Sequence, residues 1–278
     1  MREIQIKVGI VGVGNAASAF IQGLFYYNAN PNNIGLVYNS LAGYTASDLI
    51  IVSAIDISKD KVGFDLSEAI FKGANRADKI IDVPKMNVMV SMGNPLDGLI
   101  EETNEIVQLS EQDPQNVAEI FKNTDTEIVL CLLPSGADKA VEYYADEANK
   151  AGCGFINATP TSLATNPISV QKFKDSGLPL VGDDLQDQIG STILHKLILK
   201  QMEQRGVKIT ESYALDVGGG VESLNTIHRA RDIKRKIKSE SIKSALEGDA
   251  DIVAGTSDYV PHLENNRNTL IAHKQYKR

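Results

Sequence analysis

Residues 6–17 read Ile-Lys-Val-Gly-Ile-Val-Gly-Val-Gly-Asn-Ala-Ala. The first six of them predict a buried β-strand, and a helical pattern follows over residues 16–27. Between strand and helix, Gly12 permits a tight turn, Gly14 permits close approach of the backbone to a pyrophosphate, and the small Ala17 permits close helix packing. The stretch therefore predicts NAD(P) binding by a parallel α/β sheet, with a purely structural glycine turn as the alternative.

A second apolar run, residues 49–55, ends in Asp56. A carboxylate at the end of the second parallel strand accepts hydrogen bonds from ribose hydroxyls, and it would repel a 2′-phosphate, which favours NAD over NADP. Asp56 follows Ala17 by 39 positions, where about 20 is usual. The Asn-, Gly- and Ser-rich segment 28–48 accounts for the difference as an inserted loop. A helix-capping role for Asp56 is the alternative interpretation.

Composition limits the class of protein. The 278 residues allow one large or two ordinary domains, and 42% hydrophobic with 23% charged residues is typical of a soluble globular protein. No apolar run approaches the roughly 20 residues that cross a bilayer, and no signal-peptide pattern begins the chain, so a cytoplasmic location without membrane contact is predicted. The net charge of −8 disfavours nucleic acid as the main partner. The 2 cysteines and 4 histidines lack metal-ligand spacing, so no metal site is predicted.

Strands and helices alternate through the first two thirds of the chain. Residues 127–133 form a continuous apolar run of the kind that parallel sheets bury, and shorter strands are predicted at 154–157 and 178–181. A helix is expected to begin at Asp113-Pro114 and to end near Asn123. The predicted fold class is α/β, a doubly wound (Rossmann-type) parallel sheet over residues 1–182.

The character of the chain changes near Asp183. A helical pattern over 186–205 and an alternating strand pattern over 207–217 precede three glycines, and a basic stretch occupies 228–243. These features predict a second, smaller α+β domain over residues 183–278, with a catalytic or oligomerisation role.

Two groups in this second region could carry chemistry. Lys234 and Lys238 are four apart and share a helix face, where paired ammonium groups hold a phosphate, stabilise an enolate or move a proton. The alternative is a solvated basic face. The loop Gly190-Ser191-Thr192 combines glycine, hydroxyls and a helix start, which suits a phosphate, although such hydroxyls also serve as ordinary caps.

Longer blocks resemble a known family. The stretches GIVGVGNAASAFIQG, SAIDISKDKVGFDLSEAIF, NPLDG, VGDDLQDQIGSTILHK, RGVKI and LDVGGGVESLN are similar, in this order, to the myo-inositol-phosphate synthases of the shorter prokaryotic and archaeal type. The resemblance implies a cytoplasmic enzyme of inositol biosynthesis that uses NAD without net redox. It converts glucose 6-phosphate to inositol phosphate by oxidation at C5, enolisation, intramolecular aldol closure and reduction. It also implies a homo-oligomer, which is a tetramer in the family.

The resemblance also implies site residues. It assigns NAD to Gly12, Gly14, Asn15 and Ala16, and the ribose to Asp56. It brings Asp184 near the nicotinamide and the substrate phosphate to Gly190, Ser191 and Thr192. The family's catalytic lysine pair falls on Lys234 and Lys238, and Arg267 stands where the family has a further active-site lysine.

The chain also departs from the family pattern. Gln186 stands where the family has lysine, and Gly220 where it has asparagine. Family members continue beyond the position of Arg278, so the resemblance predicts that a C-terminal segment is missing. A non-catalytic relative that binds NAD or a sugar phosphate is therefore the alternative function, and a simple NAD-dependent dehydrogenase is the second alternative.

Overall fold

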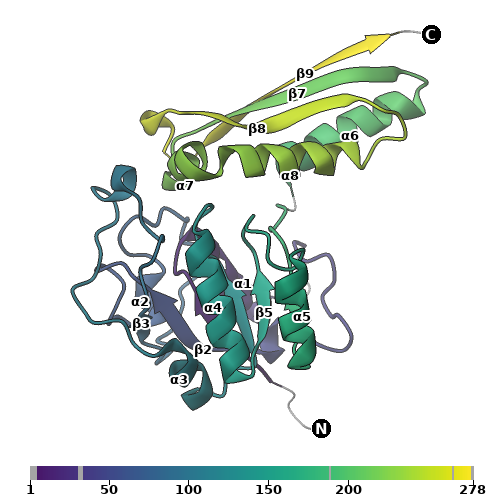
Figure 1. Cartoon of the computed structure of the whole chain (residues 1–278). Helices are drawn as coiled ribbons and strands as arrows, with labels where there is room; N and C mark the ends of the chain where they lie inside the picture. Colours follow the sequence, from purple (N-terminus) through teal and green to yellow (C-terminus); the bar gives the residue numbers. More distant parts are fainter. Residues whose placement is uncertain (1–4, 31–33, 188, 265, 277–278) are drawn as a thin grey trace. The chain divides into compact units, whose positions relative to one another are not determined.

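The computed structural model describes residues 5–30, 34–187, 189–264 and 266–276. The chain forms two compact units, Met1–Asp184 and Leu185–Arg278, which are called unit 1 and unit 2 below. Figure 1 shows a sheet with helices in each of them.

Unit 1 contains a parallel sheet of six strands in the order β3-β2-β1-β4-β5-β6. This strand order is that of the dinucleotide-binding Rossmann fold, in which ligands bind at the carboxyl ends of the strands where the order reverses. In unit 1 the reversal falls between β1 and β4. The predicted doubly wound fold is confirmed. The strands are β1 (Ile6–Val11), β2 (Leu49–Asp56), β3 (Val90–Met92), β4 (Ile128–Cys131), β5 (Gly154–Asn157) and β6 (Leu180–Val181).

Helices cover both faces of this sheet. Side chains of β1 alternate between the two faces and are apolar on each, so both faces need a covering layer. Val8 and Ile10 belong to the core formed with α1 (Asn15–Ala29) and α2 (Leu66–Ala69). Val11 belongs to the core on the other face, where three helices pack. These are α3 (Val117–Asn123), α4 (Asp138–Ala151) and α5 (Pro167–Asp175).

The predicted start of α3 was wrong. The helix begins at Val117 and not at Asp113-Pro114, because Asn116 has extended backbone angles and its side chain accepts a hydrogen bond from Glu119 N. The preceding Gln115 donates its N–H to Met92 O at the end of β3. The chain is thus tied to the sheet edge before the helix can start.

The segment 28–48 joins α1 to β2. Residues 28 and 29 still belong to α1, and the described residues that follow contain a short 3₁₀ turn, η1 (Ala46–Asp48), and no other helix or strand element. Two further 3₁₀ turns, η2 (Glu101–Thr103) and η4 (Pro261–Leu263), lie in loops elsewhere in the chain.

Unit 2 is built on a sheet of three strands in the order β8-β7-β9. The central β7 (Lys208–Gly218) pairs in parallel with β8 (Asp251–Tyr259) and in antiparallel with β9 (Arg267–Tyr276). Two helices, α6 (Ser191–Gln204) and α8 (Arg231–Lys243), pack on one face through Leu199 and Ile242. Between β7 and α8 lie α7 (Val221–Asn225) and a π-helical turn, η3 (Thr226–Ala230).

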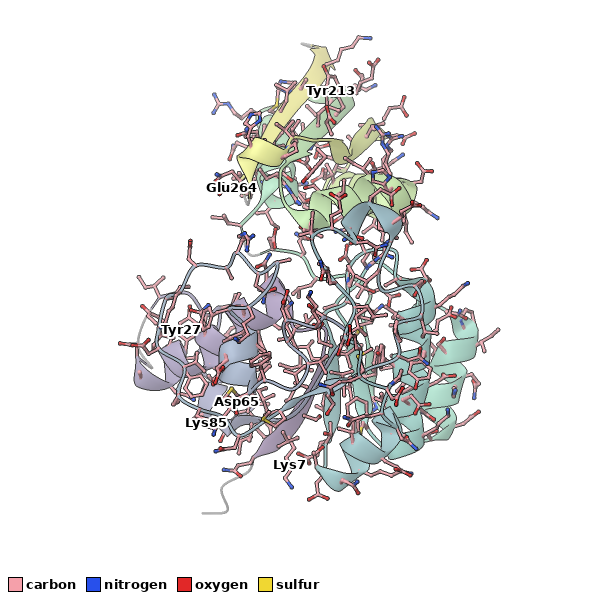
Figure 2. The ribbon with its side chains drawn as sticks, turned by 90° about the vertical axis from the view of Figure 1, so that its left-hand side faces the viewer. Lys7, Tyr27, Asp65, Lys85, Tyr213 and Glu264 are labelled. Atoms are coloured by element: carbon pink, nitrogen blue, oxygen red, sulfur yellow. The ribbon has the colours of Figure 1, made fainter. Side chains whose placement is uncertain are left out.

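The other face of this sheet carries apolar side chains. Along β7, Ser212, Ala214 and Asp216 are buried, whereas Tyr213 and Leu215 point to the opposite face and are 45% and 41% exposed. Figure 2 shows Tyr213 on this strand. Val253 and Leu270, from the two neighbouring strands, are 49% and 59% exposed.

None of the described helices has the length and apolar character that a membrane span requires. Within the described ranges, no group of three or more His, Cys, Asp or Glu side chains has the arrangement of a metal site. His195 is fully buried, and Cys131 and Cys153 are buried free thiols.

Candidate functional site

The turn after β1 depends on Gly12. Its φ angle is +91°, in the region that L side chains rarely adopt, and a Cβ atom there would lie 2.8 Å from Leu132 O at the end of β4. Gly12 also donates its N–H to Ile55 O, 2.9 Å away in β2. Glycine is therefore required here so that the turn can fit between two neighbouring strands.

Gly14 has a different role. It is the N-cap of α1, and a Cβ atom built on it would meet nothing within 4 Å. Gly14 has no side chain to cap the helix, so the first N–H groups of α1 can donate hydrogen bonds to an anion. Ala16 is exposed in this first turn. The glycine leaves space at the place where a pyrophosphate would approach the helix start.

Asn15 fastens a second segment to the glycine loop. Its Oδ1 accepts hydrogen bonds from Arg76 N at 2.7 Å and Ala77 N at 3.0 Å. Nearby, Asn75 Nδ2 donates to Val13 O at 3.1 Å. The residues after α2 thus pass beside the start of α1.

Asp56 lies at the end of β2 with only 11% of its side chain exposed. Its Oδ2 accepts a hydrogen bond from Val13 N in the glycine loop at 2.7 Å, and its Oδ1 accepts from Ile57 N and Ser58 N, each at 2.8 Å. Asp56 therefore connects the two strand ends at which the sequence predicts the cofactor. Asp56 does not cap a helix through these two contacts, because no helix begins at Ile57 or Ser58.

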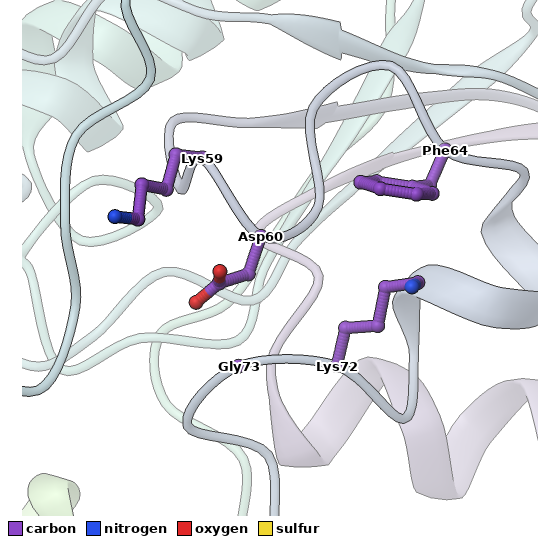
Figure 3. Close-up of a pocket in the computed structure, with 5 residues that line it drawn as sticks. All are labelled: Lys59, Asp60, Phe64, Lys72 and Gly73. Atoms are coloured by element: carbon purple, nitrogen blue, oxygen red, sulfur yellow. The ribbon is translucent and has the colours of Figure 1, made fainter.

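An open pocket of about 410 Å³ is lined in part by the turn that follows β2 (Figure 3). The Lys72 ammonium lies 4.0 Å from the centroid of the Phe64 ring. Sequence reasoning missed this pocket, although part of its lining follows Asp56 directly along the chain. The lining residues are Lys59, Asp60, Phe64, Lys72 and Gly73.

Asp183, the first of the paired aspartates at the end of unit 1, accepts several hydrogen bonds. Its carboxylate accepts from Leu163 N, Ala164 N and Thr165 N, at 2.8 to 3.1 Å, and from two side chains, Asn157 Nδ2 and Thr165 Oγ1. Burial raises the pKa of Asp183, but these hydrogen bonds outweigh it, so the pKa lies below the ordinary 3.8. Sequence reasoning missed this residue and selected its neighbour.

The neighbour, Asp184, is half-buried and has a φ angle of +67°. Its N–H donates to Thr159 O at 2.8 Å, so it is held over the loop that follows β5. A positive φ outside glycine costs energy and is more frequent at functional sites than elsewhere.

In unit 2, Gly190, Ser191 and Thr192 form the start of α6. Gly190 is the N-cap, with extended backbone angles, and Ser191 and Thr192 are half-buried in the first turn. Because Gly190 has no side chain to occupy the helix start, the first N–H groups of this 14-residue helix can bind an anion.

Lys238 of α8 reaches a buried carboxylate. Its Nζ donates to Asp216 Oδ2 at 2.7 Å, and Thr269 Oγ1 donates to Asp216 Oδ1 at 2.6 Å. Asp216 and Thr269 lie opposite each other on β7 and β9. The Asp216 side chain is 1% exposed and that of Lys238 is 18% exposed.

Lys234 and Arg267 share a second carboxylate, Glu222 of α7. Glu222 accepts from Lys234 Nζ and from an Arg267 guanidinium nitrogen, each at 3.0 Å. Partial desolvation raises the pKa of Glu222, whose side chain is 54% exposed, but the charges of Lys234 and Arg267 together lower the pKa from 4.5 to about 2. Glu222 is therefore ionised at neutral pH.

The structure thus brings together the three predicted cations of unit 2, Lys234, Lys238 and Arg267. In unit 1 it brings the glycine loop, with Gly12 and Gly14, next to Asp56. Sequence reasoning missed the two carboxylates that hold the cations. A signal was present, since Asp216 and Glu222 flank the three glycines of the LDVGGGVE stretch. Three cations face two carboxylates in this group, which leaves an excess positive charge for an anionic ligand.

The architecture defines a class, an α/β protein with a Rossmann-type unit followed by an α+β unit that carries a cluster of lysines. The family model described as myo-inositol-1-phosphate synthase matches residues 190–276. Inositol-3-phosphate synthase of Mycolicibacterium smegmatis is 38% identical over 274 residues, which cover 95% of this chain and 76% of that protein. The enzyme of the same name from Corynebacterium glutamicum is 35% identical over 274 residues, with coverage of 94% and 76%.

A solved structure has the same fold. The myo-inositol-1-phosphate synthase-related protein of Thermotoga maritima superposes with a TM-score of 0.75 at 21% identity, covering 98% of this chain and 81% of the other. The sequence identities of 38% and 35% with the two bacterial enzymes, over nearly the whole chain, show a common family and not only a common fold. The chain belongs to the myo-inositol-phosphate synthase family, which confirms the resemblance found in the sequence.

Proposed function

We propose that this protein is an NAD-dependent inositol-3-phosphate synthase, which converts glucose 6-phosphate to myo-inositol phosphate. The observation that carries the proposal is the 38% identity with a bacterial inositol-3-phosphate synthase over 95% of the chain. The cluster of Lys234, Lys238 and Arg267 supports it, because enolisation and aldol closure both develop negative charge on oxygen.

The residues of unit 1 fit NAD. Gly14 leaves open space at the start of α1, Gly12 permits the turn, and Asn15 and Ala16 belong to the first turn of the helix. Asp56 has its carboxylate at the end of β2, where ribose hydroxyls would donate to it, and Lys59 and Asp60 of the following turn line the pocket of Figure 3. NAD held by these residues would supply reversible hydride transfer, so that the reaction has no net redox change.

Within unit 2, Lys234 and Lys238 are assigned to stabilising the enolate and to proton movement, and Arg267 adds a fixed positive charge. The carboxylates of Asp216 and Glu222 orient the two ammonium groups. The substrate phosphate is assigned to Gly190, Ser191 and Thr192, where the uncapped start of α6 and two hydroxyls offer donors. Asp184 is assigned to the nicotinamide end of the cofactor, a role that its constrained backbone supports.

The proposal includes a homo-oligomer. The outward face of the β8-β7-β9 sheet presents Tyr213, Leu215, Val253 and Leu270, an apolar group of the kind that sheets bury against a partner. A second copy of the chain is the proposed partner.

One experiment separates the candidate functions. The purified protein is incubated with glucose 6-phosphate and NAD, and both inositol phosphate and NADH are quantified. A synthase forms inositol phosphate without net NADH, because the hydride returns to the product. Net NADH in proportion to substrate would instead identify a simple dehydrogenase.

The same assay tests the non-catalytic alternative. A protein that binds NAD by calorimetry but forms neither product contradicts the synthase assignment and supports a binding role. Lack of NAD binding contradicts the assignment of unit 1.

A further inference from the structure

Lys61 is a buried lysine close to the predicted cofactor loop. The residue is 6% exposed and lies in the turn that follows β2, where its N–H donates to Ser58 O. Its Nζ donates to Asn75 Oδ1 at 3.0 Å and lies 4.0 Å from Asp56 Oδ2. A buried ammonium group is costly unless charge and hydrogen bonds compensate it, and both partners here do so.

The two partners of Lys61 hold the same residue of the glycine loop. Val13 donates its N–H to Asp56 Oδ2 at 2.7 Å and accepts from Asn75 Nδ2 at its carbonyl oxygen at 3.1 Å. Val13 lies between Gly12 and Gly14, so the peptides on both sides of it are held. A closed ring of contacts therefore runs from Lys61 through Asn75, Val13 and Asp56 back to Lys61.

Glycine peptides have wide conformational freedom, and fixing them before a ligand arrives lowers the cost of binding. The ring does this at the peptides nearest to the proposed pyrophosphate site. Lys61 also balances the charge of Asp56, whose carboxylate would otherwise be a buried negative charge close to an anionic cofactor.

We propose that Lys61 is a positioning residue for the dinucleotide, which acts through Asp56 and Asn75 on the peptides at Val13. This inference rests on the proposed function of unit 1 as an NAD site. Lys61 touches neither cofactor nor substrate in this role. Its loss should weaken NAD binding and leave the chemistry of unit 2 unchanged.

The test replaces Lys61 with methionine, which keeps the length of the side chain and removes its charge and its donors. We expect the Kd for NAD, measured by calorimetry, to rise roughly tenfold or more, since hydrogen bonds to charged groups are lost. The KM for NAD should rise in parallel. The kcat at saturating NAD and the KM for glucose 6-phosphate should stay within about twofold of the wild-type values. A general structural defect would lower kcat as well.

The matched control is Lys79→Met, which makes the same change of charge at an exposed lysine paired with Asp82. Should Lys61→Met not fold, Asn75→Leu removes the three hydrogen bonds of the Asn75 side chain, to Lys61, Val13 and Ile70, and should raise the Kd for NAD likewise. If either folded variant binds NAD as tightly as the wild type, the inference is overturned. A wild-type protein without NAD affinity overturns the proposed function, and the inference with it.

Discussion

Lys238 and Asp216 form an ion pair of 2.7 Å between α8 and the central strand of unit 2, with Asp216 almost completely buried. The pair joins the proposed active site to the interior of the unit. A change at Lys238 should therefore affect both turnover and stability.

Replacing Lys238 with alanine should lower turnover about 100-fold or more, because an electrostatic contact in the transition state is lost. It should also lower the free energy of unfolding by roughly 3 kcal/mol, since the buried Asp216 loses its ammonium partner. Steady-state kinetics and denaturant titration measure the two effects. Lys236→Ala, at an exposed position of the same helix, is the control. Normal turnover in a folded Lys238→Ala protein would exclude a catalytic role.

The two loop glycines should respond differently to substitution. Gly14→Val should abolish NAD binding with little loss of stability, because the new side chain enters space that is open in the structure. Gly12→Ala should destabilise the fold by about 1–3 kcal/mol, because its backbone angle and the nearby Leu132 O exclude a Cβ atom. Calorimetry with NAD and thermal unfolding of each variant check both. Unchanged NAD affinity in Gly14→Val would contradict the assignment of the loop.

Asp183 should make the fold sensitive to acid. Its pKa is lowered in the folded protein, so its contribution to stability is complete above its unfolded value of 3.8 and is lost as the pH falls through the folded pKa. Asp183→Asn should lower the free energy of unfolding at pH 7 by about 1–3 kcal/mol. The substitution replaces one carboxylate oxygen by an NH₂ group, which cannot accept hydrogen bonds from the backbone N–H donors of the loop. The variant should also lose less further stability than the wild type in acid. Urea titrations of both proteins from neutral pH to below pH 4 measure this, with the exposed Asp113→Asn as control.

His195 should add a second pH dependence. Its Nε2 lies 2.6 Å from Ser212 Oγ, and burial first, then the charge of His273, lowers its pKa below 6.5. The unfolded chain therefore binds a proton at higher pH than the folded chain does, and stability should fall as the pH drops below about 6.5. His195→Gln should show a smaller fall, whereas His262→Gln, at an exposed residue, should behave as wild type. Equal pH profiles for wild type and His195→Gln would rule out this contribution.

The apolar face of unit 2 should decide the oligomeric state. Leu215→Lys places a charge in the middle of this face and should shift the protein to a smaller species, as measured by light scattering after gel filtration. Leu197→Lys, at a 60% exposed position on α6, is the control. If Leu215→Lys leaves the molar mass unchanged, the partner copy does not bind there.

The sequence by itself determined the class of fold and the family. An apolar strand, a glycine turn and a helix are local in the chain, so their pattern predicts the start of the parallel sheet without knowledge of distant contacts. Family blocks spread along the chain identified the relatives, and both predictions are confirmed. Local pattern was less reliable where a tertiary contact competed with it. The helix expected from Asp113 begins at Val117 because Gln115 is bonded to the end of β3.

Only the tertiary structure decided which charged groups meet. Lys238 and Asp216 are 22 positions apart, and Lys61 and Asn75 are 14 positions apart. Spacing along the chain cannot indicate such pairs, because strand register and the turn after β2 bring them together. The same holds for the two adjacent aspartates. The Asp183 carboxylate accepts hydrogen bonds from the loop at Leu163–Thr165, whereas Asp184 has a positive φ and donates its N–H to Thr159 O. Residue type is the same at both positions, so only the backbone distinguishes them.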